Sequence, residues 1–202
     1  MTEKESLAYA LSDKDIQYLL NGTKIWRYPE LQGKSLNDIF DSLGRCIVLF
    51  LTENETTGHW IAIYKGFTNR KACIHYFDPY GLRIDGGRGW LTKKQLSSLG
   101  QSYPIITELL AQADVPVYYN THKFQEMDDD IATCGRHCVC RLYFRKLTGR
   151  EYLNMINDVG LNPDEFVCEF TNVLLEDDPT DEYVNEGSGY SVKRFRKGLE
   201  QL

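Results

Sequence analysis

The stretch CIVLFLTENETTGHWIAIYKGFTNRKACIHYFDPYG, residues 46–81, decides the fold of this chain. Three runs of apolar, β-branched and aromatic residues, each of strand length, cover residues 46–52, 59–64 and 71–77. A turn at residues 66–70 separates the second run from the third, so these two are expected to pair as antiparallel strands. The third strand is expected to end at Pro79, which has no amide hydrogen to donate to a neighbouring strand.

Helical spacing of apolar residues predicts helices on both sides of these strands. The expected helices cover residues 12–20, 35–43, 92–100, 104–113, 134–147, 151–159 and 163–175, and a further strand is expected at residues 115–120. This order is typical of an α+β protein with a central, mostly antiparallel sheet flanked by helices. No linker divides the chain, so residues 1–202 are interpreted as a single domain, with an N-terminal helix region at 1–21 and a charged tail at 176–202.

Composition excludes several classes of function. The 202 residues are 42% hydrophobic and 26% charged, as in an ordinary globular protein that needs no disulfide or metal to fold. A net charge of −6 argues against a general nucleic-acid coat, although the basic cluster at residues 193–197 could bind polyanions locally. The apolar runs are too short to cross a membrane, and the acidic N-terminus does not resemble a secretory signal. An intracellular protein with free thiols is therefore expected.

The strongest chemical signal is Cys134, in the sequence TCGRHC at the expected start of a helix. The N–H groups and partial positive charge of a helix N-terminus stabilise a thiolate. Gly135 would leave room for the backbone of a substrate to approach. A small core residue, which is the usual state of a free cysteine, is the alternative that this local pattern leaves open.

A nucleophilic thiolate also needs a base and a group that orients the base. His59, one of four histidines, begins a strand next to a glycine, as a residue at the edge of a cleft would. If the second and third strands pair around a turn centred near residue 68, His59 falls opposite Phe77 or Asp78. Imidazole and carboxylate would then lie side by side. The backbone amide of Cys134 and the side chain of Gln125 are candidate donors to an oxyanion.

The ordered set of motifs is specific. GHW at residues 58–60, FDPYG at 77–81, Gln125 and TCGRHC at 133–138 together resemble the adenain family of adenovirus maturation proteases. More broadly, they resemble the clan of cysteine proteases that includes Ulp-type SUMO proteases and the capsid-maturation proteases of large DNA viruses. The resemblance covers about residues 22–147.

This resemblance implies a papain-like, adenain-like fold and the activity of a cysteine endopeptidase. Cys134 would be the nucleophile, and His59 would act first as general base and then as the acid for the leaving amine. Asp78 would hold the imidazole, and Gln125 with the Cys134 amide would form the oxyanion hole.

The resemblance also assigns substrate-binding roles to Trp60 and Trp26, in addition to the role expected of Gly135 from its small size. Trp60 would cover a narrow cleft that favours glycine near the scissile bond, and Trp26 would supply another wall. The expected substrate is a viral capsid or core precursor, cleaved by a monomer in the virion or the host cytoplasm. The adenain family has Glu where Asp78 stands, whereas Ulp-type enzymes have Asp. Residues 115–124 contain no cysteine to attach a peptide cofactor, and no cofactor or metal is expected.

Three other functions fit parts of the pattern. Cys134, His137, Cys138 and Cys140 suggest zinc, but one helix presents at most two of them on a single face. A SUMO- or ubiquitin-like-specific protease of the same clan would use identical chemistry. Thr133, where Ulp-type enzymes have Asp, favours the viral type. A non-catalytic module that binds a ubiquitin-like tail is the third alternative, although all four catalytic roles are filled here.

Overall fold

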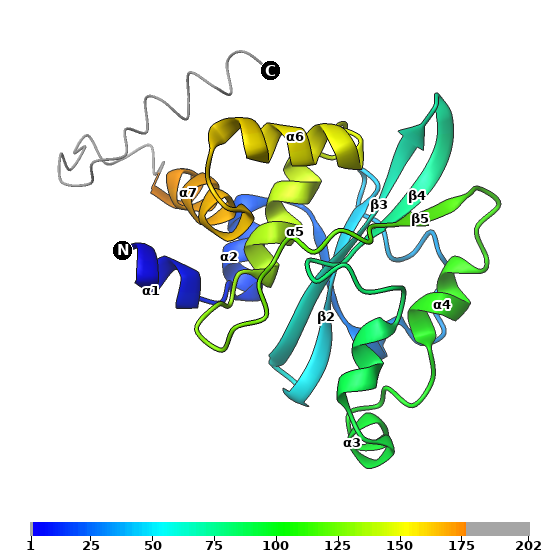
Figure 1. Cartoon of the computed structure of the whole chain (residues 1–202). Helices are drawn as coiled ribbons and strands as arrows, with labels where there is room; N and C mark the ends of the chain where they lie inside the picture. Colours follow the sequence, from blue (N-terminus) through cyan, green and yellow to red (C-terminus); the bar gives the residue numbers. More distant parts are fainter. Residues whose placement is uncertain (1, 177–202) are drawn as a thin grey trace.

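One five-stranded sheet, in the order β1-β2-β3-β4-β5, organises the structure (Figure 1). The computed structural model describes residues 2–176. The strands are β1 (Lys24–Arg27), β2 (Arg45–Asn54), β3 (Thr57–Thr68), β4 (Lys71–Phe77) and β5 (Val117–Tyr119). The pairs β2–β3 and β3–β4 are antiparallel, whereas β1 and β5 run parallel to their neighbours at the two edges. The fold is thus mixed α/β, and the prediction of an antiparallel sheet is confirmed for the three central strands.

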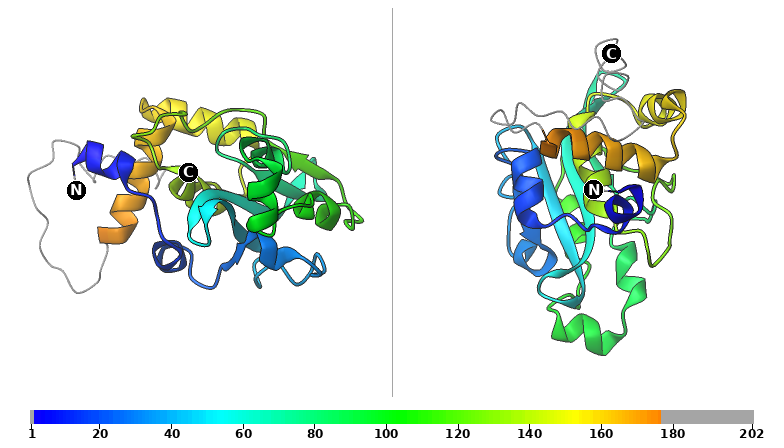
Figure 2. Two further views of the ribbon diagram at one scale, coloured as in Figure 1. Left: turned by 90° about the horizontal axis from the view of Figure 1, so that it is seen from below. Right: turned by 90° about the vertical axis from the view of Figure 1, so that its left-hand side faces the viewer.

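Helices cover both faces of this sheet (Figures 1 and 2). The α-helices are α1 (Glu3–Ala8), α2 (Asp13–Leu19), α3 (Lys93–Ser98), α4 (Ile105–Leu110), α5 (Cys134–Tyr143), α6 (Gly149–Val159) and α7 (Pro163–Glu176). Two short 3-10 helices, η1 (Tyr28–Leu31) and η2 (Gly86–Trp90), connect other elements. The N-terminal helices α1 and α2, in the region predicted at residues 1–21, pack against α7 (Figure 2).

The alternating side chains of β2 divide the interior into two hydrophobic cores. Ile47 and Leu49 belong to the core shared with α2, α5, α6 and α7. Val48 and Phe50 belong to the core on the other face, shared with η1 and α4. Because both faces are covered, β2 is a continuous apolar run rather than an alternating one.

The β3–β4 hairpin shows why the predicted strand register is wrong. Its turn consists of Asn69 and Arg70, both with positive φ values of 52° and 62°, as a two-residue type I′ turn requires. Ala62 therefore pairs with Phe77, and the same register, continued past the end of β4, brings His59 opposite Tyr80. Asp78 follows β4 and is not the strand partner of His59. Its side chain nevertheless reaches the imidazole of His59.

The helix predicted at residues 35–43 is wrong, and turns replace it. The backbone amide and hydroxyl of Ser35 donate to Asp38 at 2.9 and 2.7 Å, as at a helix start. The carboxylate of Asp41 then accepts from the amide of Arg45 at 2.8 Å, and Gly44 has a φ of 72°. These contacts reverse the chain into β2 before a second helical turn forms.

The other predicted helices and the strand at 115–120 are confirmed, with small differences at their ends. The helix expected to reach residue 147 ends at Tyr143, and Gly149 begins α6 rather than ending α5. Helix α1 and strand β1 were not predicted. All six cysteines lie within the described residues and are free thiols. A charged tail was predicted at residues 176–202. Residues 177–202, which include its basic cluster, lie outside the described residues. Between residues 2 and 176, no helix is both long and apolar enough to cross a bilayer.

Candidate active site

Cys134 is the first residue of α5 and the most exposed of the six cysteines, although only 9% of its surface is accessible. It lines a cleft of about 650 Å³ between the N-terminal segment at residues 10–17 and strands β1 to β3. Thr133, which precedes the helix, does not cap it with its side chain. The amides of the first turn are therefore not occupied by a side-chain cap, and their partial positive charge favours an anion at this position.

His59 and Asp78 form a buried pair beside this cysteine. The Nε2 atom of His59 lies 3.1 Å from Oδ1 of Asp78. The same carboxylate oxygen accepts from the amide of Tyr80 at 2.8 Å. The Asn120 side chain bonds the backbone N–H and C=O of Asp78 at 2.8 and 2.7 Å, which fixes this residue after the end of β4. Because Nε2 faces Asp78, Nδ1 is the ring nitrogen left for Cys134.

The surroundings of His59 favour its protonated form. Burial of the ring acts to lower its pKa, but hydrogen bonds with Asp78 and Cys134, together with their negative charge, outweigh burial and raise the pKa to about 9. The ring is therefore an imidazolium at neutral pH. A cation beside a cysteine favours the thiolate, which is the nucleophilic form of the side chain.

Two aromatic residues that the sequence analysis assigned no role hold the imidazole in place. Tyr80 stacks on His59 with ring centroids 4.7 Å apart, and Trp90 meets the same ring edge-on at 5.3 Å. Tyr80 lies within the recognised motif FDPYG, whereas Trp90 follows a glycine-rich loop and carried no signal of its own. Burial raises the pKa of Tyr80 to about 12, although a hydrogen bond with Gln125 opposes this rise.

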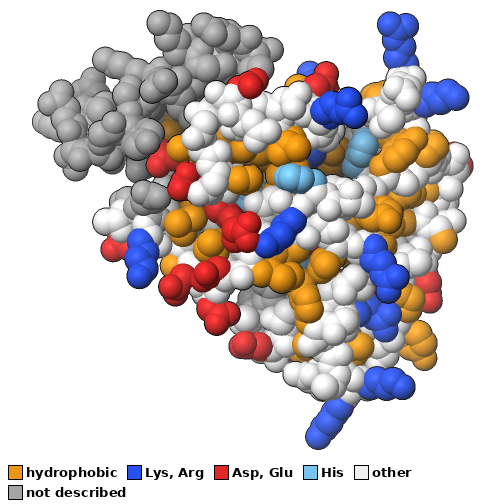
Figure 3. Space-filling view, in the orientation of Figure 1, with side chains coloured by type: hydrophobic (Ala, Val, Ile, Leu, Met, Phe, Trp, Pro, Cys, Tyr) orange, Lys and Arg blue, Asp and Glu red, His pale blue; other side chains and the backbone are white. Residues whose placement is uncertain are grey.

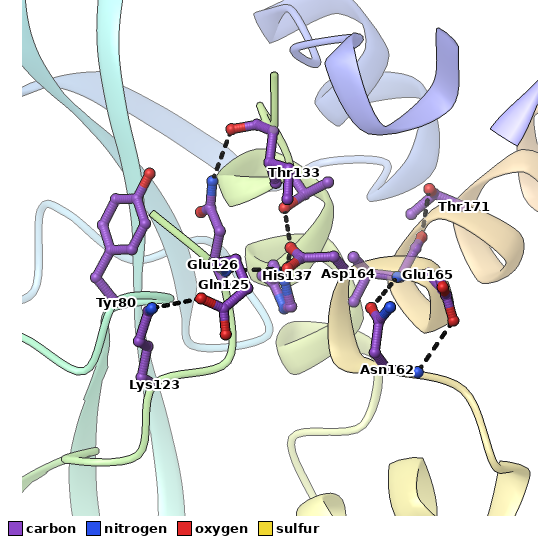
Figure 4. Close-up of polar contacts among 12 residues, drawn as sticks. Tyr80, Lys123, Gln125, Glu126, Thr133, His137, Asn162, Asp164, Glu165 and Thr171 are labelled. Atoms are coloured by element: carbon purple, nitrogen blue, oxygen red, sulfur yellow. Dashed lines mark hydrogen bonds and ion pairs between the residues drawn. The ribbon is translucent and has the colours of Figure 1, made fainter. Parts of the chain in front are cut away.

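Gln125 lies buried beside the start of α5 (Figure 4). Its backbone amide donates to the carbonyl of Pro79 at 3.0 Å, which ties the loop to the end of β4. Its side-chain Nε2 donates to the carbonyl of Ile131 at 3.3 Å, three residues before Cys134. An amide nitrogen has two hydrogens, and the second is donated to Tyr80, so Gln125 must release Tyr80 to donate to an oxyanion.

The three predicted substrate-binding residues have different positions. Trp60 and Trp26 both line the cleft, as expected, and Trp60 Nε1 donates to the carbonyl of Leu11 at 3.1 Å. Gly135 is buried, and a Cβ there would lie 3.1 Å from both Leu11 Cβ and Trp60 Cδ1. The space above Gly135 is thus filled by the protein itself. The prediction that Gly135 admits a substrate backbone is corrected: it allows Leu11 and Trp60 to pack against α5.

The side chains that suggested zinc contact separate partners. His137 binds Asp164 through Nε2 at 3.0 Å, and the Cys138 thiol donates to the Trp60 carbonyl at 3.3 Å. Burial raises the pKa of both Cys138 and Cys140 well above the usual value. Within residues 2–176, no three side chains of His, Cys, Asp or Glu are grouped as metal ligands. The zinc interpretation therefore gains no geometric support.

A second cysteine–histidine contact lies on β4, where Cys73 Sγ is 3.2 Å from His75 Nε2. Burial, followed by the charge of Arg141, lowers the pKa of His75 to about 4. This imidazole is neutral at physiological pH and cannot supply the cation that favours a thiolate. Cys134 is therefore the better candidate nucleophile.

Acidic side chains gather on the face of the molecule seen in Figure 3. The loop at residues 126–130, which follows Gln125, contributes Glu126, Asp128, Asp129 and Asp130, all exposed.

Comparisons with known proteins identify a viral relative. The chain is 33% identical over 168 residues to "Uncharacterized protein V9" of Sputnik virophage, and the match covers 80% of this chain and 94% of that protein. The chain belongs to the same protein family as this virophage protein. This relative agrees with the prediction of a viral protein made from the sequence.

The remaining comparisons indicate no protease family. No family model matches the chain. The central domain of uncharacterized Lpg1148 from Legionella pneumophila aligns with a TM-score of 0.38 and 15% identity, covering 82% of this chain and 98% of that domain. Similarity at that level supports neither a shared fold nor a shared function. Any assignment of activity therefore depends on the geometry of the site.

Gly58→Ala is expected to lower the free energy of unfolding by about 3 kcal/mol, because overpacking against rigid backbone is costly. A Cβ at Gly58 would lie 2.0 Å from the carbonyl oxygen of Phe50, so the β2–β3 hairpin that carries His59 must shift. Urea unfolding measures the change. Gly149→Ala is the control, since nothing lies within 4 Å of the added methyl group. Equal unfolding midpoints for the two variants would contradict this packing.

Proposed function

We propose that this protein is a cysteine endopeptidase in which Cys134, His59 and Asp78 form the catalytic triad. One observation carries the proposal. His59 directs Nε2 to a buried carboxylate 3.1 Å away and leaves Nδ1 for a cysteine at the head of a helix and the mouth of a cleft. Gln125 and the Cys134 amide complete the site as the oxyanion hole.

The proposed reaction follows from these positions. The Cys134 thiolate attacks the carbonyl carbon of the scissile peptide, and the Gln125 side chain and the Cys134 amide stabilise the oxyanion. The His59 imidazolium then gives its proton to the departing amine. In the second half, the neutral His59 removes a proton from water, and the hydroxide attacks the thioester carbon. The C–S bond then breaks, which releases the carboxylic acid product and restores the Cys134 thiolate and the His59 imidazolium. Asp78 keeps the imidazole oriented throughout and stabilises its charge.

The proposed substrate is a viral capsid or core precursor that is cleaved near glycine. The virophage relative supports a viral substrate. Trp26 and Trp60 wall a cleft of about 650 Å³, which has room for a short extended segment of polypeptide. A protease specific for SUMO- or ubiquitin-like proteins is the alternative, because the same triad would serve it equally.

A cleavage assay tests both the activity and the substrate. The protein is incubated with Gly-Gly-X and Gly-X-Gly peptides and with ubiquitin-like precursors, and products are read by mass spectrometry. We expect cleavage of the glycine-containing peptides. Cleavage of ubiquitin-like precursors alone would contradict the viral substrate while keeping the enzyme class. A protein that binds a ubiquitin-like tail without cleaving any substrate would be a binding module.

Hydrolysis is expected to decline as the pH rises above about 9, because His59 must be protonated to release the amine. The same proton contributes to stability. The pKa of His59 rises from 6.5 to about 9 on folding, so its contribution is complete below pH 6.5 and is lost through pH 9. A profile of kcat/KM against pH measures the first effect. Melting temperatures of wild type and His59→Gln at pH 6 and 9.5 measure the second, with the larger decrease expected in the wild type.

A further inference from the structure

A second buried pair of histidine and aspartate, His137 and Asp164, joins the first turn of α5 to α7 (Figure 4). Asp164 is the second residue of α7, and only 3% of its surface is exposed. Its Oδ1 atom accepts hydrogen bonds from His137 Nε2 at 3.0 Å and from the hydroxyl of Thr133. Its Oδ2 atom accepts from the backbone amide of Glu126 at 3.0 Å. One carboxylate therefore connects three parts of the chain.

The protonation states of this pair indicate a structural role rather than proton transfer. Burial acts to raise the pKa of Asp164, but its hydrogen bonds with His137, Thr133 and Glu126 outweigh burial and lower the pKa. Burial lowers the pKa of His137 by more than the carboxylate raises it. The pair is an ionised carboxylate and a neutral imidazole, and neither contacts the cleft where a proton would be needed.

The three donors to Asp164 all adjoin the proposed oxyanion hole. Thr133 directly precedes α5, one residue before Cys134. His137 lies in the first turn of the helix, three residues after Cys134. Glu126 directly follows Gln125. The carboxylate also engages the hydroxyl of Thr133, which would otherwise be placed to cap the helix and occupy an amide of its first turn.

We propose that Asp164 is a positioning residue that holds the Gln125 loop against the first turn of α5 and so sets the geometry of the oxyanion hole. This inference rests on the proposed function. Asp164 does not touch the substrate in this account; it acts through Gln125 and through the Cys134 amide. The two halves of the hole come from segments that this carboxylate connects in addition to the Gln125 contacts with Ile131 and Pro79, so losing either Asp164 connection loosens the two halves.

Asp164→Asn tests the proposal with little change in shape. Asparagine offers one acceptor oxygen where the carboxylate offers two. If that oxygen faces Thr133 and His137, the amide hydrogens face the N–H of Glu126 and the loop loses its anchor. If the side chain is turned over, Glu126 keeps its bond, and the amide nitrogen faces Thr133 and His137, which accept from it only after the hydroxyl turns round and the imidazole proton moves to Nδ1. The first orientation removes the anchor of the loop, and the second replaces the charged acceptor of Thr133 and His137 with a neutral donor.

We expect Asp164→Asn to lower kcat for peptide hydrolysis by about 10- to 100-fold, comparable with weakening one oxyanion donor. KM should change less than about twofold, because the cleft walls are untouched. The rate of Cys134 alkylation by iodoacetamide should also be nearly unchanged, since alkylation needs the thiolate but forms no oxyanion. Equal losses in hydrolysis and alkylation would show that Asp164 only maintains the fold around Cys134, and would overturn the proposal.

Glu165→Gln is the matched control. It removes one acidic charge from the next residue of the same helix, where the Glu165 carboxylate accepts from the backbone amide of Asn162 at 3.1 Å. Glutamine keeps an acceptor oxygen, so this variant should hydrolyse peptides at the wild-type rate. Identical kinetics of Asp164→Asn and Glu165→Gln would also overturn the proposal.

Hydrogen exchange separates this proposal from the proposed function. Amides at residues 126–133 should exchange at least tenfold faster in Asp164→Asn than in the wild type or in Glu165→Gln, while the strands keep their protection. Unchanged exchange in this loop would overturn the role of Asp164 even in an active protease. If the wild type hydrolyses none of the substrates but the loop does lose protection, the proposed function fails and the anchoring of the loop stands.

Discussion

Replacement of Cys134 by alanine is expected to abolish hydrolysis, with a decrease in kcat of at least ~10⁴-fold. The substitution removes the sulfur atom that forms the thioester. Stability should change by only about 1 kcal/mol, because one sulfur is lost from a small side chain at the surface of the core. Steady-state hydrolysis and urea unfolding measure the two effects.

Cys140→Ala is the control for this experiment. Cys140 lies in the same helix, is fully buried and contacts neither His59 nor the cleft. Its replacement should therefore leave kcat within about threefold of the wild type. Substantial hydrolysis by Cys134→Ala, or comparable losses in both variants, would contradict the assignment of the nucleophile.

His59→Ala is expected to be nearly as severe, with a loss of about 10⁴-fold or more, because both the base and the amine's proton donor disappear. Asp78→Asn should cost less, since asparagine still accepts a hydrogen bond but no longer stabilises the imidazolium. It should also move the alkaline limb of the pH profile below 9, because Asp78 helps to raise the pKa of His59. An unmoved limb would show that another group titrates there, and near wild-type activity of His59→Ala would exclude it as the base.

The central strands could be predicted because their signals are local. Three apolar runs separated by turns correspond to β2, β3 and β4, whose pairing brings the GHW and DPYG motifs to the same end of the sheet. The exact register could not be predicted, because Asn69 and Arg70 form a turn that usually contains glycine. The prediction that His59 and Asp78 lie side by side holds despite this error, since a side chain can reach across a small shift in register.

Long-range contacts account for what the sequence analysis missed. Trp90 is 31 positions from His59 in the chain, and only the folding of the glycine-rich loop brings the two rings together. Asp164 lies in α7, outside the segment covered by the family resemblance, and looks in isolation like an acidic residue at a helix start. Gly135 was misjudged for the same reason, because the two residues that fill its space, Leu11 and Trp60, come from the distant N-terminal segment and from β3.

The rate of alkylation at each cysteine tests most directly whether His59 activates Cys134. Wild type and His59→Ala are treated with limiting iodoacetamide at pH 7, and modification of all six cysteines is followed by mass spectrometry. In the wild type, Cys134 should react at least ~10²-fold faster than any other cysteine, and this advantage should disappear in His59→Ala. Preferential modification of a different cysteine, or a Cys134 rate that does not depend on His59, would contradict the account.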